Sequence, residues 1–186
     1  MTESMNRAVL LDRLGQVFRD RGYEGATLTQ LAAATGLGKA SLYHHFPGGK
    51  AEMAEVLLRD AVAELQRRAF AKLDGDGPPN ERLQRFVDGF GDYLQHSGGQ
   101  CLLAALTLGS ASQGHAARIA AQFDDWTGAL ARVFEASGQK RKRAARSAAD
   151  LLGRLYGAQL LSKLAGDPKH LRQTLKRLAR SVADGG

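Results

Sequence analysis

Apolar residues recur every three to four positions along most of the chain, and no segment alternates apolar and polar positions. This spacing puts the apolar side chains on one face of an α-helix. It predicts helices over 5–22, 50–73, 81–95, 101–110, 115–137, 144–164 and from Asp167-Pro168 onward. The Gly- and Pro-rich stretch 74–80 between two of them predicts a surface loop. We therefore expect an all-α protein.

The stretch 27–46 has the pattern of a helix, a tight turn and a second, short helix. The hydroxyl of Thr27 can cap the first helix by accepting from its free backbone amides. Gly36 tolerates the left-handed conformation in which helices commonly end. Apolar positions follow at helical spacing: Leu28, Leu31, Ala32, Leu42 and Phe46. The pattern indicates a helix-turn-helix DNA-reading head, although any two-helix hairpin with a glycine turn would share it.

The second helix of this hairpin carries small and hydrogen-bonding residues on its other face. Small residues let a helix approach base edges closely, and Lys, Ser, Tyr and His can donate to phosphates or bases. The residues predicted to contact DNA are Lys39, Ala40, Ser41, Tyr43 and His44, with Thr27 and Thr29 positioning the backbone. The alternative is a short solvated helix packed on its neighbour.

Together with its flanks, the hairpin resembles the N-terminal motif of TetR-family transcriptional regulators over residues 5–58. Residues of the family's types stand at Phe18, Gly22-Tyr23, Ala26-Thr27, Leu31-Ala32, Gly36-Leu37, Lys39, Ser41-Leu42-Tyr43 and His45-Phe46. The resemblance implies that Lys50 opens the fourth helix and touches a phosphate. Gly38 departs from the family, which more often has a small hydroxyl residue there, so one phosphate contact is expected to be missing.

The length of 186 residues allows one large domain or two small ones. A three-helix head of about 48 residues is too small to bury much core by itself, so we expect it to lean on the long fourth helix. With the resemblance, this predicts a helix-turn-helix DNA-binding domain over 1–49 and a helical effector-binding and dimerisation domain over 50–186.

Aromatic residues gather in the middle of the chain, between about residues 83 and 160. Ligand pockets are mostly apolar with a few polar groups, but an aromatic stripe at helical spacing is more often plain core. The resemblance implies an effector here, and the segment from Cys101 to Leu106 is similar to the LmrA/YxaF-type subgroup. The candidate ligand contacts are Phe86, Phe90, Tyr93, Cys101, Ala105, Phe123, Trp126, Leu130 and Tyr156. Cys101 is interpreted as a small buried hydrophobe, with thiol sensing as the alternative.

The two C-terminal helices could finish the core or form an interface. Ala148, Gly153 and Gly157 would let another helix pack closely, and the spacing predicts that Leu160 and Leu161 are buried. The resemblance implies a four-helix interface in a homodimer, formed by Leu152, Leu155, Tyr156, Leu160, Leu171, Leu175 and Leu178. A two-fold dimer would set its reading helices in successive major grooves about 34–36 Å apart, on an approximately palindromic operator.

The net charge of +7 is unevenly placed. Residues 1–50 carry six Lys/Arg and four Asp/Glu, and residues 51–138 carry eight Lys/Arg and twelve Asp/Glu. Residues 139–186 carry twelve Lys/Arg and only three Asp/Glu. The basic run 140–146 is interpreted as a solvated helix face. A role in attracting DNA is the alternative.

Several function classes find no support in the sequence. The polar N-terminus does not resemble a signal peptide, and no apolar run approaches the roughly 18 residues of a membrane span, so we expect a cytoplasmic protein. The single cysteine excludes an internal disulfide, and the five histidines lack zinc-site spacing. No phosphate-binding loop, G-x-S-x-G elbow or acid/base pair is evident, so we expect neither enzymatic activity nor a cofactor or metal.

The sequence thus favours a ligand-responsive transcriptional regulator. It would bind a palindromic operator as a homodimer, most simply as a repressor, and be released by a small-molecule effector. Two alternatives stay open. One is a non-specific architectural DNA-binding protein that uses the basic C-terminal face, and the other is a small-molecule binding protein whose head is vestigial.

Overall fold

The computed structural model describes residues 6–107 and 112–183, and these segments contain α-helices, one 3-10 helix and connecting loops, with no strand among them. The prediction of an all-α protein is confirmed. The helices are α1 (Arg7–Gly25), α2 (Leu28–Thr35), α3 (Lys39–His45), α4 (Gly49–Arg68), η1 (Phe70–Asp74), α5 (Pro79–His96), α6 (Leu102–Thr107), α7 (Ser112–Ala136), α8 (Arg141–Ala165) and α9 (Lys169–Ala183). The expected helix over 101–110 extends in part beyond the described residues. No described helix is both long and apolar enough to cross a membrane.

The chain forms two compact units. Unit 1 consists of Met1–Val62 and Cys101–Ala117, and unit 2 of Ala63–Gln100 and Arg118–Gly186. The helix α4 therefore begins in unit 1 and ends in unit 2. This grouping differs from a single cut after residue 49, because a segment near the middle of the chain returns to the N-terminal helices. The functional division at residue 49 stays a prediction.

Unit 1 is built on the three N-terminal helices. Its buried apolar residues include Leu10, Leu14, Phe18, Leu31, Leu42 and Phe46. Two glycines shape these helices: Gly22 interrupts α1 with φ +67°, and Gly36 ends α2 with φ +71°. Both conformations are left-handed, which residues with a Cβ rarely adopt. The turn expected at Gly36 is confirmed.

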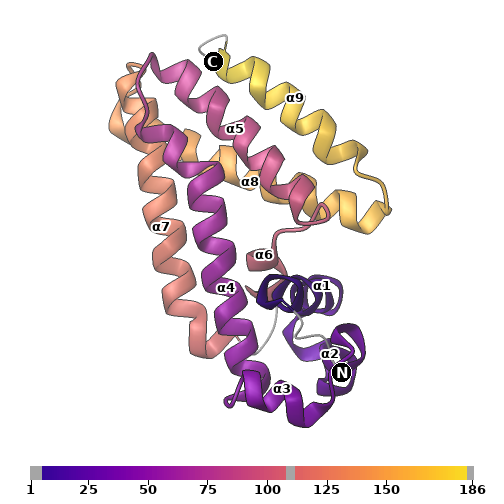
Figure 1. The fold of residues 1–186 in the computed structure, drawn as a ribbon. Helices are drawn as coiled ribbons and strands as arrows, with labels where there is room; N and C mark the ends of the chain where they lie inside the picture. Colours follow the sequence, from indigo (N-terminus) through magenta and orange to yellow (C-terminus); the bar gives the residue numbers. More distant parts are fainter. Residues whose placement is uncertain (1–5, 108–111, 184–186) are drawn as a thin grey trace. The chain divides into compact units, whose positions relative to one another are not determined.

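The short helix α6 packs on α1 in the same unit (Figure 1). A Cβ added at Gly22 would lie 3.5 Å from the carbonyl oxygen of Ala105, so the two backbones approach closely at this glycine. Cys101, Leu102 and Leu103 are buried beside it. A segment about 80 residues away in the sequence thus becomes part of the head unit, which its sequence pattern alone did not predict.

In unit 2, α5 packs against α9 and η1, and α8 packs against α9 (Figure 1). The largest fully buried side chains of this unit are aromatic: Phe70, Phe86, Phe90 and Trp126. At Gly89 of α5, the backbone carbonyl of Arg68 occupies the space that a Cβ would need. The helix α5 can therefore approach the end of α4 only because this position has no side chain.

Two expectations about unit 2 were wrong. The fourth helix ends at Arg68 rather than near residue 73, because the chain tightens into η1, where Phe70 and Leu73 turn inward. The guanidinium of Arg82 donates to the carbonyl of Leu73 at 2.7 Å and satisfies one backbone group at the end of this turn. Leu160 and Leu161 are not buried in the chain but are 49% and 53% exposed, since they lie on the outer face of α8.

Candidate functional site

The helix α3 is fixed to unit 1 by its apolar side. Leu42 and Phe46 are both fully buried, and the amide of Phe46 closes the helix by donating to the carbonyl of Leu42 at 2.8 Å. Residues at other angles around the helix therefore face outward. All five predicted contact residues on α3 are exposed: Lys39, Ala40, Ser41, Tyr43 and His44. The side that carries hydrogen-bonding groups is thus open to a partner.

The start of α3 lacks a side-chain cap, because Gly38 stands at the N-cap. The absence of a hydroxyl at this position agrees with the departure noted in the sequence. The first backbone amides of α3 therefore donate no hydrogen bond to a side chain at position 38.

Tyr43 is supported on one side and open on the other. Tyr43 is 46% exposed. If Gly49 carried a Cβ, that atom would lie 3.2 Å from Cε1 of the Tyr43 ring. Gly49 also has φ +64°, so both its conformation and its closeness to the ring favour glycine. The Tyr43 ring therefore lies close to the start of α4, and much of the residue is exposed.

The two threonines at the start of α2 are exposed. The hydroxyl of Thr27 accepts from the amide of Gln30 at 3.3 Å, and the Gln30 side chain accepts from the amide of Thr27 at 3.0 Å. This reciprocal pair is a capping box and confirms the predicted cap. The Thr27 hydroxyl keeps its own hydrogen as a donor, and Thr29 faces solvent beside it.

Lys50 has a partner that sequence reasoning missed. Its ammonium donates to the carbonyl of Tyr23 at 3.0 Å and lies 4.4 Å from the centroid of the Tyr23 ring. The two contacts tie the start of α4 to the end of α1. An ammonium has three N–H donors, so this bond leaves others for a phosphate.

The structure brings six of the predicted effector residues into one aromatic cluster: Phe86, Phe90, Tyr93, Phe123, Trp126 and Tyr156. The Tyr156 ring lies 5.7 Å from that of Phe90 and 5.4 Å from that of Phe123, and the rings of Phe90 and Tyr93 are 6.4 Å apart. Trp126 lies 5.5 Å from Phe123, and its indole N–H donates to Gln66 at 3.1 Å. We call this set, with Phe70, the aromatic cluster.

Phe70 is the member that sequence reasoning missed. It stacks on Trp126 at 4.5 Å, with the two rings nearly parallel. The interpretation of residues 50–73 as one continuous helix hid its role, since the chain changes to a 3-10 helix before it. Leu130 is buried in the same unit, whereas Cys101 and Ala105 belong to unit 1. Cys101 is a buried free cysteine.

Some of the predicted dimerisation residues point into the chain's own core, and others face outward. Leu152, Leu155, Leu171 and Leu178 are buried within the chain itself, and Tyr156 and Leu175 are half-buried. Leu160 faces outward, as do Leu161 and Leu164, which were not among the predicted interface residues. The inward positions stabilise the packing of α8 and α9 and leave the next turns of α8 exposed.

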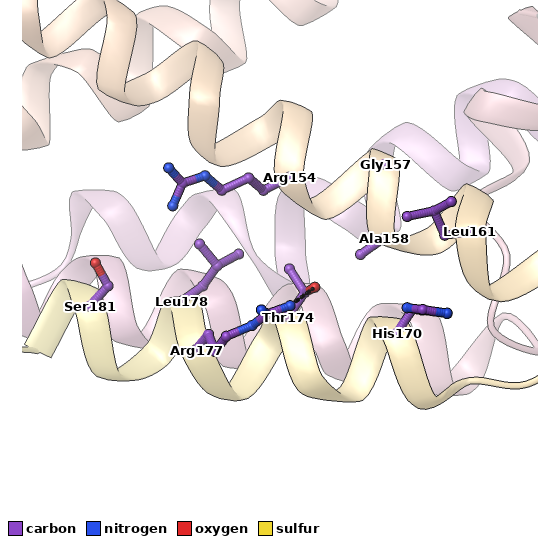
Figure 2. Close-up of a pocket in the computed structure, with 9 residues that line it drawn as sticks. All are labelled: Arg154, Gly157, Ala158, Leu161, His170, Thr174, Arg177, Leu178 and Ser181. Carbon is purple, nitrogen blue, oxygen red and sulfur yellow. Dashed lines mark hydrogen bonds between the residues drawn. The ribbon is translucent and has the colours of Figure 1, made fainter.

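Between α8 and α9 lies an open groove of about 500 Å³ (Figure 2). It is lined by Arg154, Gly157, Ala158, Leu161, His170, Thr174, Arg177, Leu178 and Ser181. Arg177 donates to the hydroxyl of Thr174 at 3.4 Å across one turn of α9. The outer face of α8 beside this groove, with its exposed leucines and small residues, is the surface on which another helix could pack.

The basic run 140–146 lies at the N-terminal end of α8, and its lysine and arginine residues are exposed.

The arrangement defines a helix-turn-helix protein with a helical second region. Two family models match the sequence: "Bacterial regulatory proteins, tetR family" over residues 10–57 and "Transcriptional regulator LmrA/YxaF-like, C-terminal domain" over residues 79–177. The second match alone spans more than half of the chain. The protein belongs to the TetR family of transcriptional regulators, with a C-terminal domain of the LmrA/YxaF-like type. This family comprises regulators rather than enzymes.

Known relatives agree with this assignment. The chain is 31% identical over 109 residues to the HTH-type transcriptional repressor DhaR of Mycobacterium sp. (strain GP1), covering 58% of this chain and 54% of DhaR. The chain spans about half the length of the curated relatives it matches first.

Solved structures share the fold at low sequence identity. A TetR transcriptional regulator from Legionella pneumophila superposes with a TM-score of 0.75 at 18% identity, covering 97% of this chain and 99% of that one. AibR in complex with isovaleryl coenzyme A and operator DNA gives a TM-score of 0.63 at 20% identity, covering 81% of this chain and 85% of AibR.

Proposed function

We propose that this protein is a ligand-responsive repressor that binds a palindromic operator as a homodimer and releases it when a small-molecule effector binds. The observation that carries the proposal is the presentation of α3. Its apolar side is pinned by Leu42 and Phe46, while Lys39, Ser41 and Tyr43 are exposed with donors suited to phosphates and base edges. DhaR, a repressor by name, and AibR, solved with operator DNA, support the same role.

In this proposal residues 1–49 bind DNA and residues 50–186 bind the effector and dimerise. Thr27, Thr29 and Lys50 position the head on the DNA backbone, while α3 enters the major groove. Lys50 would contact a phosphate with the donors that its bond to Tyr23 leaves over.

The aromatic cluster of unit 2 is the proposed effector site. It offers several large apolar rings, which suit a small organic guest. AibR supports effector binding in this fold, since it was solved with isovaleryl coenzyme A. The helix α6 follows α5 directly in the chain and packs on α1, so a displacement of α5 on effector binding would reach the head through α6. An effector acts this way only if it binds one of the two conformations more tightly.

The first experiment is a gel-shift titration against the DNA that flanks this protein's own coding region. A scrambled duplex is titrated in parallel, each at two salt concentrations. We expect selective binding that persists at the higher salt, because base contacts add to the salt-dependent phosphate term. Equal binding to both duplexes that disappears with salt would instead support the architectural alternative. Absence of binding even after selection from random sequences would support a vestigial head.

The proposed dimer predicts a strong effect of charge on the outer face of α8. Replacing Leu161 with Glu should raise the dimer dissociation constant by roughly 100-fold, because a two-fold interface buries the new carboxylate twice. Sedimentation velocity at micromolar protein measures the shift from dimer to monomer. Val9→Glu is the matched control, since Val9 is 42% exposed on α1 and lies off this face. A dimer that persists in Leu161→Glu would exclude this face as the interface.

A further inference from the structure

We propose that the outward side of α9 is a second DNA-binding surface, which holds double-stranded DNA by its phosphates without reading its sequence. The surface consists of Lys169, Arg172, Lys176 and Arg180, and we call these four residues the basic line. It would act independently of the helix-turn-helix head, so it goes beyond the proposed repressor function and does not rest on it.

The packed side of α9 determines which way the basic line faces. Leu171, Leu178 and Val182 are buried. Leu175 lies against α5, since a Cβ added at Gly91 would be 3.3 Å from its Cδ1. The residues of the basic line stand at i, i+3, i+7 and i+11, a spacing that places them together on another side of the helix. All four are exposed.

The basic line is also distinct from the groove between α8 and α9. His170, Arg177 and Ser181 are among the residues that line this groove (Figure 2). Each of them directly follows a residue of the basic line, and one position turns about 100° around a helix. The basic line therefore points away from the groove that borders the proposed dimer contact.

The charge of α9 is almost uncompensated. The helix contains five Lys/Arg and no Asp/Glu. Asp167, just before the helix, lies 3.8 Å from Arg172, and with side chains 53% and 63% exposed this pair contributes little. Lys169, Lys176 and Arg180 form no ion pair with any carboxylate of the described residues.

These charges do not help the helix to form. Lys176 stands four residues from both Arg172 and Arg180, and like charges at this spacing repel across the helix surface. Lys169 and Arg172 also lie in the first turn, where the helix dipole favours negative charge. A polyanion bound along the basic line would remove both penalties.

Duplex DNA is the polyanion that this surface fits. It carries one negative charge per about 1.7 Å of its axis, and Lys and Arg contact its phosphates. From Lys169 to Arg180 the basic line extends about 16 Å along the helix axis, so it can face several phosphates at once. Phosphate contacts carry no base information, and we therefore expect binding to any duplex.

A membrane surface fits less well. Amphipathic helices that bind membranes bury their apolar side in the lipid. The apolar side of α9 is instead packed on α5 and α8. Vesicles of phosphatidylcholine and phosphatidylserine in equal parts test this alternative, and full-length protein that binds them but not a scrambled duplex would overturn the proposal.

The first test separates binding from folding with Lys176→Glu. This change replaces two repulsive pairs, with Arg172 and Arg180, by two attractive ones, so the thermal midpoint in low-salt buffer should rise by about 1–4 °C. The same variant should bind a scrambled duplex at least 10-fold more weakly, as measured by fluorescence anisotropy. A lower midpoint, or an unchanged affinity, would overturn the proposal.

The second test measures the salt dependence of binding to the scrambled duplex. Neutralising Lys169, Lys176 and Arg180 together, each to Gln, should lower the affinity at low salt at least 10-fold. The slope of log K against log salt concentration should decrease in magnitude by about 2–3, because each lost phosphate contact counts about 0.9.

A matched variant removes three exposed cations elsewhere in unit 2. Arg67→Gln, Lys72→Gln and Arg132→Gln together change the net charge by the same amount but leave α9 intact. This variant should change the affinity for the scrambled duplex by no more than about 2-fold. Equal losses in the two triple variants would show that only net charge matters and would overturn the proposal.

A bridging experiment separates the basic line from the head. An immobilised operator duplex is saturated with protein, and a scrambled duplex is then passed over it at low salt. We expect the second duplex to be retained by the unmodified protein and the matched variant, but not by the α9 triple variant. Failure of the unmodified protein to retain it would overturn the proposal and leave the repressor function intact. Anisotropy that shows α9-dependent binding without any operator preference would do the reverse.

Discussion

Replacing Tyr43 with Ala is expected to lower operator affinity at least 100-fold, the largest effect of any single change at the DNA-facing surface. Tyr43 is nearly half exposed and its ring lies close to Gly49, on the open side of α3. Its loss removes a hydrogen-bond donor, worth about 0.5–1.5 kcal/mol, and the apolar surface of the ring, worth about 1.5–3 kcal/mol when the DNA covers it. Gel-shift titration on the selected operator measures the change.

Two comparisons make the Tyr43 result interpretable. Tyr43→Phe retains the ring and its seat on Gly49, so it should lose only the hydroxyl's share, roughly 10-fold. Circular dichroism and sedimentation should be unchanged in both variants, because the buried anchors Leu42 and Phe46 are intact. Operator binding by Tyr43→Ala at the unmodified affinity would contradict the role assigned to α3.

Replacing Gly89 with Ala is expected to destabilise unit 2 by about 3 kcal/mol and to lower its thermal midpoint by about 6–12 °C. The new Cβ would collide with the backbone carbonyl of Arg68, which cannot rotate away as a side chain could. The helix α5 must therefore move away from the end of α4, and its buried Phe86 and Phe90 move with it. Thermal or urea unfolding followed by circular dichroism tests this expectation.

Gly128→Ala is the matched control for this change. Gly128 is also within a helix, and the nearest atom to its added Cβ is the flexible guanidinium end of Arg132, at 3.7 Å. An alanine there should stabilise the protein by about 0.5–1 kcal/mol through the lower entropy of the unfolded chain. Equal stability of the Gly89 and Gly128 variants would show that α5 and α4 can separate at little cost.

Local sequence was sufficient for the features that depend on neighbouring residues. The cap at Thr27 and the left-handed turn at Gly36 follow from a hydroxyl beside free amides and from the absence of a Cβ, and both are confirmed. The exposed face of α3 follows from helical spacing, since Leu42 and Phe46 determine which side is buried.

Sequence spacing was not sufficient where two helix faces are both apolar. On α8 it indicated burial for Leu160 and Leu161, which are exposed: Leu155 and Ala158 are covered within the chain, whereas Leu161 borders the open groove between α8 and α9. Likewise, the helical pattern runs without interruption past Arg68, whereas in the structure the chain changes there to a 3-10 helix whose Phe70 stacks on Trp126.

The sequence by itself therefore determined the fold class, the helix-turn-helix head and the outward face of α3, because caps, glycine turns and helical periodicity act over a few residues. The tertiary structure decided what lies far apart in the chain: the bond of Lys50 to Tyr23, the packing of α6 on α1 and the stack of Phe70 on Trp126. Such contacts depend on which helices pack together and at what angle, and periodicity along one helix carries no information about the residue that meets it from another.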